Sequence, residues 1–312
     1  MLNGLLLFFD DFARLPPAVQ YAFVVAFGLV IGSFVTVVVH RLPIMLERDW
    51  QATVETYLDE AQNHRAPDAV PARTAAPHGS SYNLMRPGSR CDACGHGLRA
   101  WENIPVLSYL VLRGRCSACH APISARYPLI ELSTGLIAAL AWWRFGPGML
   151  AVAAFAFGAV SLTLACIDWD TRLLPDSITL PFLWAGLLVN LNPTFAMLGD
   201  AVIGAAAGYL FLWAIYWGFW WLRGIEGIGL GDLKLFAAIG AWLGWGALVQ
   251  VLVLASLGGA IVGVALLATR RLRRDEPLPF GPFLAIAACV TLFVGTPLWP
   301  MMSLHGLGGL GG

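Results

Sequence analysis

The chain contains eight apolar stretches, and the longer ones can each cross the roughly 30 Å hydrocarbon core of a membrane as a helix. They are residues 17–39, 128–143, 149–167, 178–191, 201–222, 233–245, 246–268 and 282–298. Hydrophobic residues make up 58% of the 312 residues, which is more apolar surface than one soluble core can bury. The sequence therefore predicts an all-α polytopic membrane protein with about eight transmembrane helices.

The basic residues predict the orientation of these helices, because Lys and Arg gather on the cytoplasmic side of a membrane. With the N-terminus outside, seventeen of the nineteen Lys and Arg fall in four cytoplasmic segments, residues 40–127, 168–177, 223–234 and 269–281. Only Arg14 and Arg144 lie on the other side. The first 16 residues lack a basic start and a small-residue cleavage site, so no removable signal peptide is expected. The formal net charge of zero gives no reason to expect nucleic acid as a partner.

Composition divides the chain into four parts. We expect an N-terminal segment with the first transmembrane helix (1–39), a small cytoplasmic domain inserted between helices 1 and 2 (40–127), a transmembrane domain (128–300) and a flexible, glycine-rich tail (301–312). Within the inserted domain, apolar residues at helical spacing predict an amphipathic helix that packs on its own domain or on the lipid surface; they are Trp50, Val54, Tyr57, Leu58 and Ala61.

Four cysteines in the inserted domain have the spacing of a metal site. They form two Cys-x2-Cys motifs, with Cys91 and Cys94 in CDAC and Cys116 and Cys119 in CSAC. Four thiolates complete the tetrahedral shell of a structural zinc ion and leave no position for a reactive water. The alternative, a reducible thiol pair, is disfavoured because the cytoplasm keeps thiols reduced.

Four further residues bear on this site. His96 and His120 lie beside the two motifs and can replace a ligand, but positions outside the metal shell are expected for them. Cys166 and Cys289 lie in apolar stretches and are interpreted as core residues.

Acidic residues at the ends of membrane helices are functional candidates, because ionisable groups are costly to hold in or near a bilayer. The candidates are Glu131, Asp168, Asp170, Asp176, Glu226 and Asp232. The expected topology places Asp168 and Asp232 on the same, cytoplasmic, side. Two carboxylates within hydrogen-bond reach share one proton, so that one can deprotonate water while the other protonates a scissile amide. This is aspartic protease chemistry.

Other roles for these residues stay open on the sequence alone. Asp232 follows glycines at 227, 229 and 231, which can admit a peptide backbone, or it can cap the next helix. Lys234 is two positions beyond Asp232 and is expected to extend towards the membrane interface instead of pairing with it. Asp170 can belong to a metal-binding Asp-x-Asp, which nothing else supports. A non-catalytic membrane scaffold with a zinc recruitment domain is the main alternative function, and a proton-coupled transporter is a weaker one.

Five segments, in order along nearly the whole chain, resemble the type IV prepilin peptidases, aspartic peptidase family A24. They are GSFVTVVVHRLP (32–43), SRCDACGHGLRAWENIPVLSYLVLRGRCSACHAPISARYPLIEL (89–132), IDWDTRLLPDSITLP (167–181), GIGLGDLKLFAAIGAWLG (227–244) and LPFGPFLA (278–285).

The resemblance implies an enzyme of the bacterial inner membrane that serves type IV pilus or type II secretion systems. It implies Asp168 and Asp232 as the catalytic pair and prepilins or pseudopilins as substrates, cleaved after a glycine at the cytoplasmic face. It also implies that the new N-terminus is methylated from S-adenosylmethionine by the N-terminal soluble region. Two residues depart from the family pattern: Thr36 replaces an asparagine of GSF-x-N, and Asp92 replaces a proline of the first cysteine motif. No G-x-G-x-x-G motif after a strand predicts where S-adenosylmethionine binds.

Overall fold

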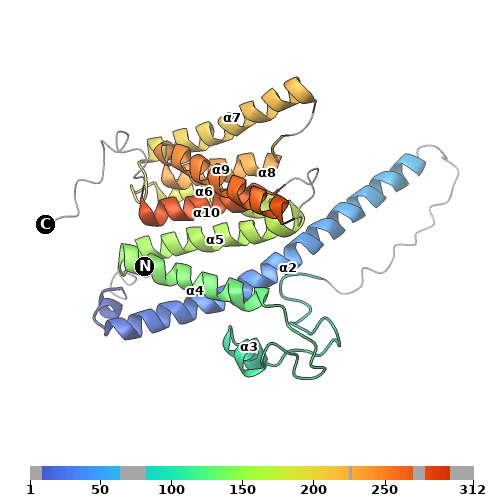
Figure 1. Ribbon diagram of the computed structural model, residues 1–312, viewed down its shortest axis with the longest axis vertical. Coiled ribbons are helices and arrows are strands. Elements are labelled where there is room, and N and C mark those ends of the chain that lie inside the picture. The colour runs from blue at the N-terminus through green and yellow to red at the C-terminus, as the bar shows by residue number, and fades with distance from the viewer. Residues whose placement is uncertain (1–8, 64–81, 225–226, 270–277, 296–312) are drawn as a thin grey trace. The chain divides into compact units, whose positions relative to one another are not determined.

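The computed structural model describes residues 9–63, 82–224, 227–269 and 278–295, and these are helical with no strand, only two isolated β-bridges (Figure 1). The elements are α2 (Pro17–Asn63), the 3-10 turn η1 (Ala100–Asn103), α3 (Leu107–Val111), α4 (Arg126–Phe145), α5 (Met149–Thr171), α6 (Asp176–Val189), α7 (Leu198–Arg223), α8 (Leu230–Leu243), α9 (Trp245–Ala268) and α10 (Gly281–Val294). The predicted all-α class is confirmed. Glu226 and the tail 301–312 lie outside the described residues.

Fewer helices than predicted have the length to span a membrane. By length and composition, four helices of the described chain do so: α2, α5, α7 and α9. Helices α6, α8 and α10 have 14 residues each, and 14 residues rise only about 21 Å. Helix α4 has 20 residues but includes Arg126, Glu131 and Arg144. A helix covers most of each apolar stretch, but apolar composition alone does not distinguish a spanning helix from one buried among other helices.

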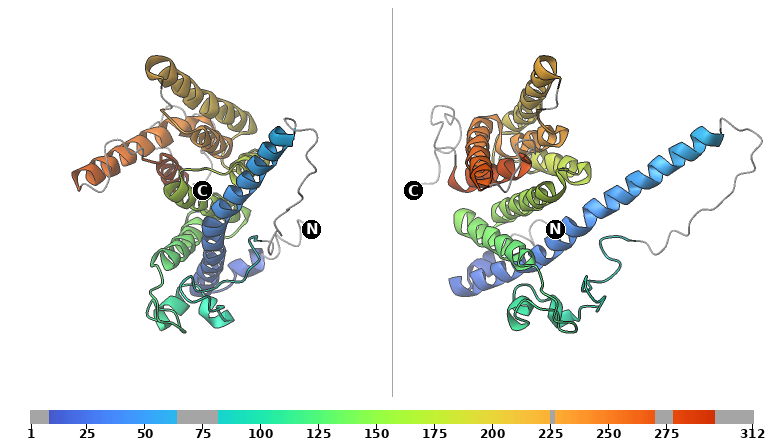
Figure 2. Two further views of the ribbon diagram at one scale, coloured as in Figure 1. Left: turned by 90° about the vertical axis from the view of Figure 1, so that its right-hand side faces the viewer. Right: turned by 45° about the vertical axis from the view of Figure 1, so that its right-hand side comes forward.

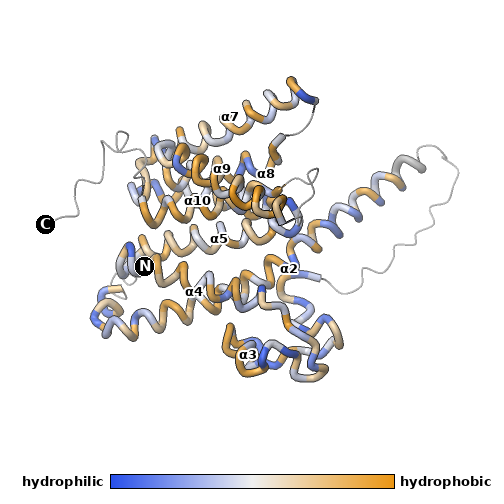
Figure 3. Tube along the Cα trace, in the orientation of Figure 1, coloured by the Kyte–Doolittle hydropathy of each residue, from blue (hydrophilic) through white to orange (hydrophobic). Residues whose placement is uncertain are grey.

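Helix α2 is longer than its apolar stretch. The sequence predicts a transmembrane helix that ends at residue 39 and a separate amphipathic helix near residue 50, but α2 runs through both for 47 residues, with Pro43 inside it. Figure 3 shows the change from apolar to mixed polar character along α2. The single hydrogen bond that Pro43 removes does not end the helix.

The chain divides into two compact units, residues 29–132 and residues 1–28 with 133–312. In the second, which we call the helical unit, α8 packs against α6, α7, α9 and α10 (Figure 2). Its side chains Leu233, Leu235 and Ile239 are fully buried. A short helix in this position has no need to span the membrane, because its neighbours cover it on several sides.

Close backbone contact joins α7 and α8. A Cβ added to Gly204 would lie 2.5 Å from the carbonyl oxygen of Gly240, and one added to Gly208 would lie 2.8 Å from that of Phe236. Small residues allow helices in membranes to pack at short distances, where dispersion contacts replace the missing hydrophobic driving force. These glycines hold α8 in place from one side.

Asn190 ends α6 and holds the C-terminal end of α8. Its side-chain amide donates to the carbonyls of Ala241 and Trp242 at 2.9 and 2.8 Å, and its Oδ1 accepts from the N–H groups of Phe195 and Ala196 at 3.0 and 3.1 Å. These bonds satisfy carbonyls that have no partner within their own helix. One fully buried amide therefore caps the last turn of α8, next to the C-cap Gly244 at φ 77°.

Candidate active site and metal centre

Asp168 lies in the last turn of α5 and is 5% exposed. Its carboxylate accepts a hydrogen bond from the backbone N–H of Gly281, the first residue of α10. A Cβ added to Gly281 would lie 2.6 Å from Asp168 Oδ2, so a larger residue cannot fit here without movement. The start of α10 is thus shaped around this carboxylate.

Asp232 lies in the first turn of α8 and is 7% exposed. The N-cap of α8 is Gly229, so the alternative that Asp232 occupies the cap position is wrong. The Asp232 carboxylate accepts a hydrogen bond from the N–H of Gly229, and the Asp232 N–H donates to the Gly229 carbonyl at 3.1 Å. This reciprocal contact folds the Gly-x-Gly-Asp segment back on itself and orients the side chain.

The structure brings the two aspartates together. They lie close enough to interact electrostatically. The Leu174 side chain lies beside the start of α8 and the start of α10. Cβ atoms added to Gly231 and Gly281 would lie 2.8 and 3.2 Å from it. Asp168 Oδ2 and Asp232 Oδ1 are buried, and no donor among the described residues reaches either atom. Two buried carboxylates therefore each keep one oxygen free to bind a ligand.

The other acidic candidates take other positions. Asp176 receives two hydrogen bonds from Lys234 Nζ, at 2.6 and 2.7 Å. Lys234 therefore pairs with Asp176 in the first turn of α6 and not with Asp232, as expected, and its extension towards the membrane interface stays a prediction. Asp170 is exposed at the end of α5. Glu131 lies in the other unit, described below.

The four predicted cysteines form one cluster. The sulfurs of Cys91, Cys94, Cys116 and Cys119 all lie within 4.8 Å of one another, and those of Cys91 and Cys119 are 3.8 Å apart. Four sulfurs at about 2.3 Å from a tetrahedral zinc ion stand about 3.8 Å from each other. The donor set and its spacing fit zinc.

Two turns of the same form present these sulfurs. In the first, Cys91 N–H donates to the His96 carbonyl and Gly95 N–H to the Cys91 carbonyl; in the second, Cys116 N–H donates to Ala121 and His120 N–H to Cys116. Gly95 and His120 have φ values of 72° and 58°, the left-handed conformation that closes each turn. The chain thus repeats one turn twice, and each turn supplies two ligands.

Backbone amides favour the thiolate form of Cys116, whereas the pKa of Cys94 is raised to about 12 beside the other sulfurs. The N–H groups of Cys119 and Ala118 donate to the sulfur of Cys116 and lower its pKa to about 6. Metal binding requires thiolates, so these turns are organised for a cation.

The neighbouring histidines and the remaining cysteines are not part of the cluster that the described residues form. His96 Nε2 lies 3.4 Å from Glu102 Oε2, and His120 is exposed. Neither Cys166 in α5 nor Cys289 in α10 joins the sulfurs, and Cys289 packs against the apolar core as predicted.

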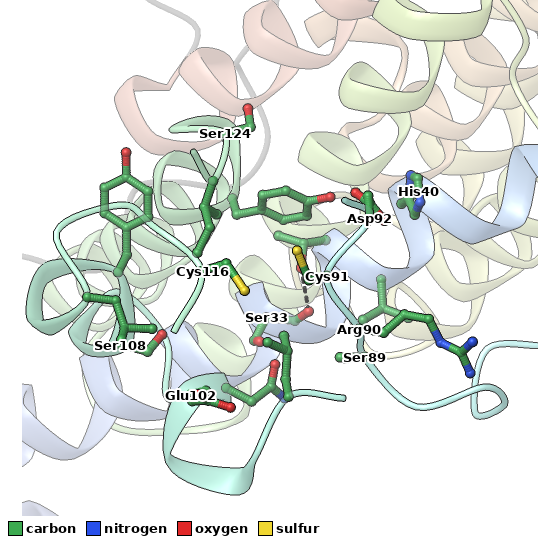
Figure 4. A pocket seen from close by; sticks show the side chains of 18 of the residues that line it. Ser33, His40, Ser89, Arg90, Cys91, Asp92, Glu102, Ser108, Cys116 and Ser124 are labelled. Atoms are coloured by element: carbon green, nitrogen blue, oxygen red, sulfur yellow. Dashed lines mark hydrogen bonds between the residues drawn. The ribbon is translucent and has the colours of Figure 1, made fainter. Parts of the chain in front are cut away.

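A pocket that sequence reasoning did not find lies within residues 29–132 (Figure 4). Its volume is about 520 Å³, and its walls come from α2, the two cysteine turns, α3 and the start of α4. Glu131 lines it and is 8% exposed; its Oε2 accepts from the N–H of Val106 at 2.7 Å, and the Ser33 side chain also binds the carboxylate. The only sequence signal was the acidic residue itself, because the walls come from segments about 100 residues apart.

The fold and these two sites define a helical membrane protein that carries a buried carboxylate pair and a four-cysteine centre. Residues 26–145 match the model of the bacterial peptidase A24 N-terminal domain, and residues 155–264 match that of the type IV leader peptidase family. The cysteines and the pocket fall in the first match, and both aspartates fall in the second.

Curated relatives cover nearly the whole chain. A prepilin leader peptidase/N-methyltransferase of Burkholderia pseudomallei is 56% identical over 93% of this chain and 91% of its own. Proteins of the same name from Aeromonas hydrophila and Pseudomonas aeruginosa are 51% and 46% identical, over 89% and 86% of this chain and 92% and 88% of their own. The search of solved structures gave no match. The chain belongs to the type IV leader peptidase family and is an enzyme of that class.

Proposed function

We propose that this protein is an intramembrane aspartyl endopeptidase that removes the leader from type IV prepilins or pseudopilins, and that it then methylates the new N-terminus. The observation that carries the proposal is the pair Asp168 and Asp232, buried on two helices, in electrostatic contact, each with one oxygen free of protein donors. The names of the relatives supply the substrate class, prepilins with a leader.

The pair can perform hydrolysis without a metal ion. One carboxylate takes a proton from a water molecule as the water oxygen attacks the scissile carbonyl carbon. The other, protonated, carboxyl gives its proton to the leaving amide nitrogen as the C–N bond breaks. The step requires that the pair holds one proton, which the burial of both carboxylates and the repulsion between them favour.

The glycines near the aspartate pair have two different roles. At Gly231 and Gly281, Leu174 and Asp168 occupy the space that a side chain would need, so these glycines let the helices pack closely against each other. Gly229 is open, since an added Cβ would meet only Asp232 Oδ2, at 3.3 Å. The proposed entry of a substrate backbone, with cleavage after its glycine, is therefore beside Gly229.

The orientation and the metal are part of the same proposal. The positive-inside distribution of Lys and Arg supports an inner-membrane protein with both aspartates facing the cytoplasm. Cys91, Cys94, Cys116 and Cys119 would hold a zinc ion with all four positions filled by protein. Its role would be to fold residues 29–132, because no open position remains for water.

The second reaction needs a methyl donor, and the relatives' names support S-adenosylmethionine. When bound, S-adenosylmethionine would supply the methyl group for the deprotonated N-terminal amine of the cleaved substrate. The pocket of residues 29–132 has both charge signs and aromatic rings in its walls, which fits such a compound.

Leader cleavage tests the proposal. The purified protein is incubated with a peptide that has a basic leader, Gly and Phe, followed by an apolar helix, and the products are read by mass. We expect cleavage after the glycine, loss of cleavage in Asp168→Asn and Asp232→Asn, and normal cleavage in Asp170→Asn, an exposed neighbour in the same helical turn as Asp168. Full cleavage by the first two variants would reject the assignment and favour the scaffold.

A further inference from the structure

We infer that the pocket within residues 29–132 binds an adenosyl sulfonium compound, with Glu131 facing its positive charge. The inference rests on the methylation step proposed above and assigns it a site.

The pocket has the size and position of a cofactor site. Its volume of about 520 Å³ falls within the roughly 300–1,000 Å³ of small-molecule sites. Elements from two ends of the unit, α2 and the start of α4, form its walls together with the cysteine turns. Two of the clustered cysteines, Cys91 and Cys116, line it.

The side chains in its walls match the parts of such a ligand. Tyr109 and Tyr127 offer aromatic faces for a purine ring, whereas the ring of Tyr82 already has the Arg48 guanidinium 4.4 Å from its centre. Arg90 is exposed in the wall and can pair with a carboxylate. A ligand with a flat ring, a carboxylate and a positive centre uses all three kinds of group.

Glu131 is the side chain that would face the positive charge of the ligand. Burial raises the pKa of Glu131, because an ionised carboxylate is costly in an apolar site unless a cation or several donors compensate it. Its partners in the structure are neutral, the Val106 N–H and the Ser33 side chain, and no Lys, Arg or His of the described residues forms an ion pair with it. The nearby Arg41 instead donates to the carbonyls of Asn83 and Leu84 at 3.1 and 3.3 Å. A cationic ligand would supply the missing charge.

The backbone at Val106 holds this carboxylate in a fixed orientation. Val106 has φ 59° and ψ −45°, a conformation that a β-branched residue rarely adopts. Strained backbone of this kind persists where the surrounding structure imposes it, often at binding sites. Because the hydrogen bond to Glu131 comes from this residue, the carboxylate is oriented before a ligand arrives.

Thr36, which replaces the asparagine of the family pattern, also lines this pocket. It is buried, and its hydroxyl donates to the Ser33 carbonyl at 2.7 Å. The departure from the family pattern therefore lies beside the Glu131 partner Ser33, in a different unit from the aspartate pair.

Binding to the full-length, zinc-loaded protein tests the inference. Isothermal titration calorimetry compares S-adenosylmethionine with S-adenosylhomocysteine, which has a neutral thioether in place of the sulfonium and is otherwise alike. In Glu131→Gln we expect the Kd of the first to rise about tenfold or more, as for a lost charged hydrogen bond, and that of the second to change less than about threefold. Ser108→Phe, which fills the pocket, should abolish binding of both.

Cleavage and zinc content separate the possible failures. Both variants should cleave the leader peptide normally and bind zinc, which shows that they are folded. If they cleave normally and still bind S-adenosylmethionine as the unchanged protein does, the pocket is not the donor site. If Glu131→Gln lowers the affinity for both compounds equally, Glu131 does not recognise the sulfonium charge, and this part of the inference is overturned. If the unchanged protein cleaves the leader peptide but binds neither compound, both the methylation proposal and this inference fail. If the unchanged protein does not cleave the leader peptide, the peptidase proposal is rejected instead.

Discussion

The two compact units hold their functional side chains by different means. In the helical unit, the aspartates are oriented by single backbone N–H groups and by glycines that let α5, α8 and α10 meet. In residues 29–132 the described elements between α2 and α4 are short turns, and few apolar side chains are buried there. Helix packing orients the aspartates where the core is large, whereas the small, loop-rich unit has a cluster of four cysteines that could hold a metal ion.

Removal of the metal should give the largest effect, and it should unfold residues within 29–132 while the helical unit stays folded. Structural zinc binds with of order 10 kcal/mol of free energy that is also folding free energy. Cys116→Ser, or a strong chelator, should therefore unfold the region around 90–120, seen as rapid proteolysis there. The matched variant Cys166→Ser, outside the cluster, should leave it resistant. Unchanged resistance in Cys116→Ser would count against a structural zinc.

Gly281→Ala should impair the aspartate pair without unfolding the helical unit. The added methyl group would lie 2.6 Å from Asp168 Oδ2 and must displace the carboxylate. A shift of about 1 Å in a catalytic group costs on the order of 100-fold in rate. We expect kcat for leader cleavage to fall by ~10 to 100-fold with unchanged circular dichroism. Gly218→Ala, in α7 with no neighbour near its Cβ and without a positive φ, controls for the loss of a glycine.

Asn190→Ala should test how far the helical unit depends on one polar contact. It leaves two carbonyls of α8 and two N–H groups without their partner, and an unsatisfied buried group costs about 1–3 kcal/mol. The thermal midpoint of the detergent-solubilised protein should fall by several degrees, while zinc content stays the same. An unchanged midpoint would show that water or lipid replaces these bonds.

The smallest effect is expected from Lys234→Met. The ion pair with Asp176 is partly exposed, with side chains 31% and 55% accessible, and such pairs contribute about 1 kcal/mol or less. Leader cleavage should stay within about twofold of the unchanged protein, because Lys234 pairs with Asp176 and not with Asp168 or Asp232. A loss comparable to that of Asp232→Asn would instead place Lys234 in the catalytic site.

The same contrast explains what the sequence could predict. Helix positions followed from apolar stretches, and the cysteine cluster followed from the spacing of two short motifs, because both signals are local. Other contacts join segments that are far apart in the chain. Val106 and Glu131 are 25 residues apart, Asn190 and Ala241 are 51 apart, and Asp176 and Lys234 are 58 apart. No periodicity in the sequence indicates these contacts. The length of α2 was missed because a change from apolar to polar residues was interpreted as a helix end.

The central claim is that Asp168 and Asp232 act as one unit, and a cycle of variants tests it most directly. The quantity to measure is kcat/KM for leader cleavage by Asp168→Asn, Asp232→Asn and the double variant. Groups that act together are not additive, so each single variant should lose as much as the double variant, by ~100-fold or more for lost acid–base chemistry. Losses that multiply in the double variant, or one single variant with full activity, would contradict the shared-proton pair.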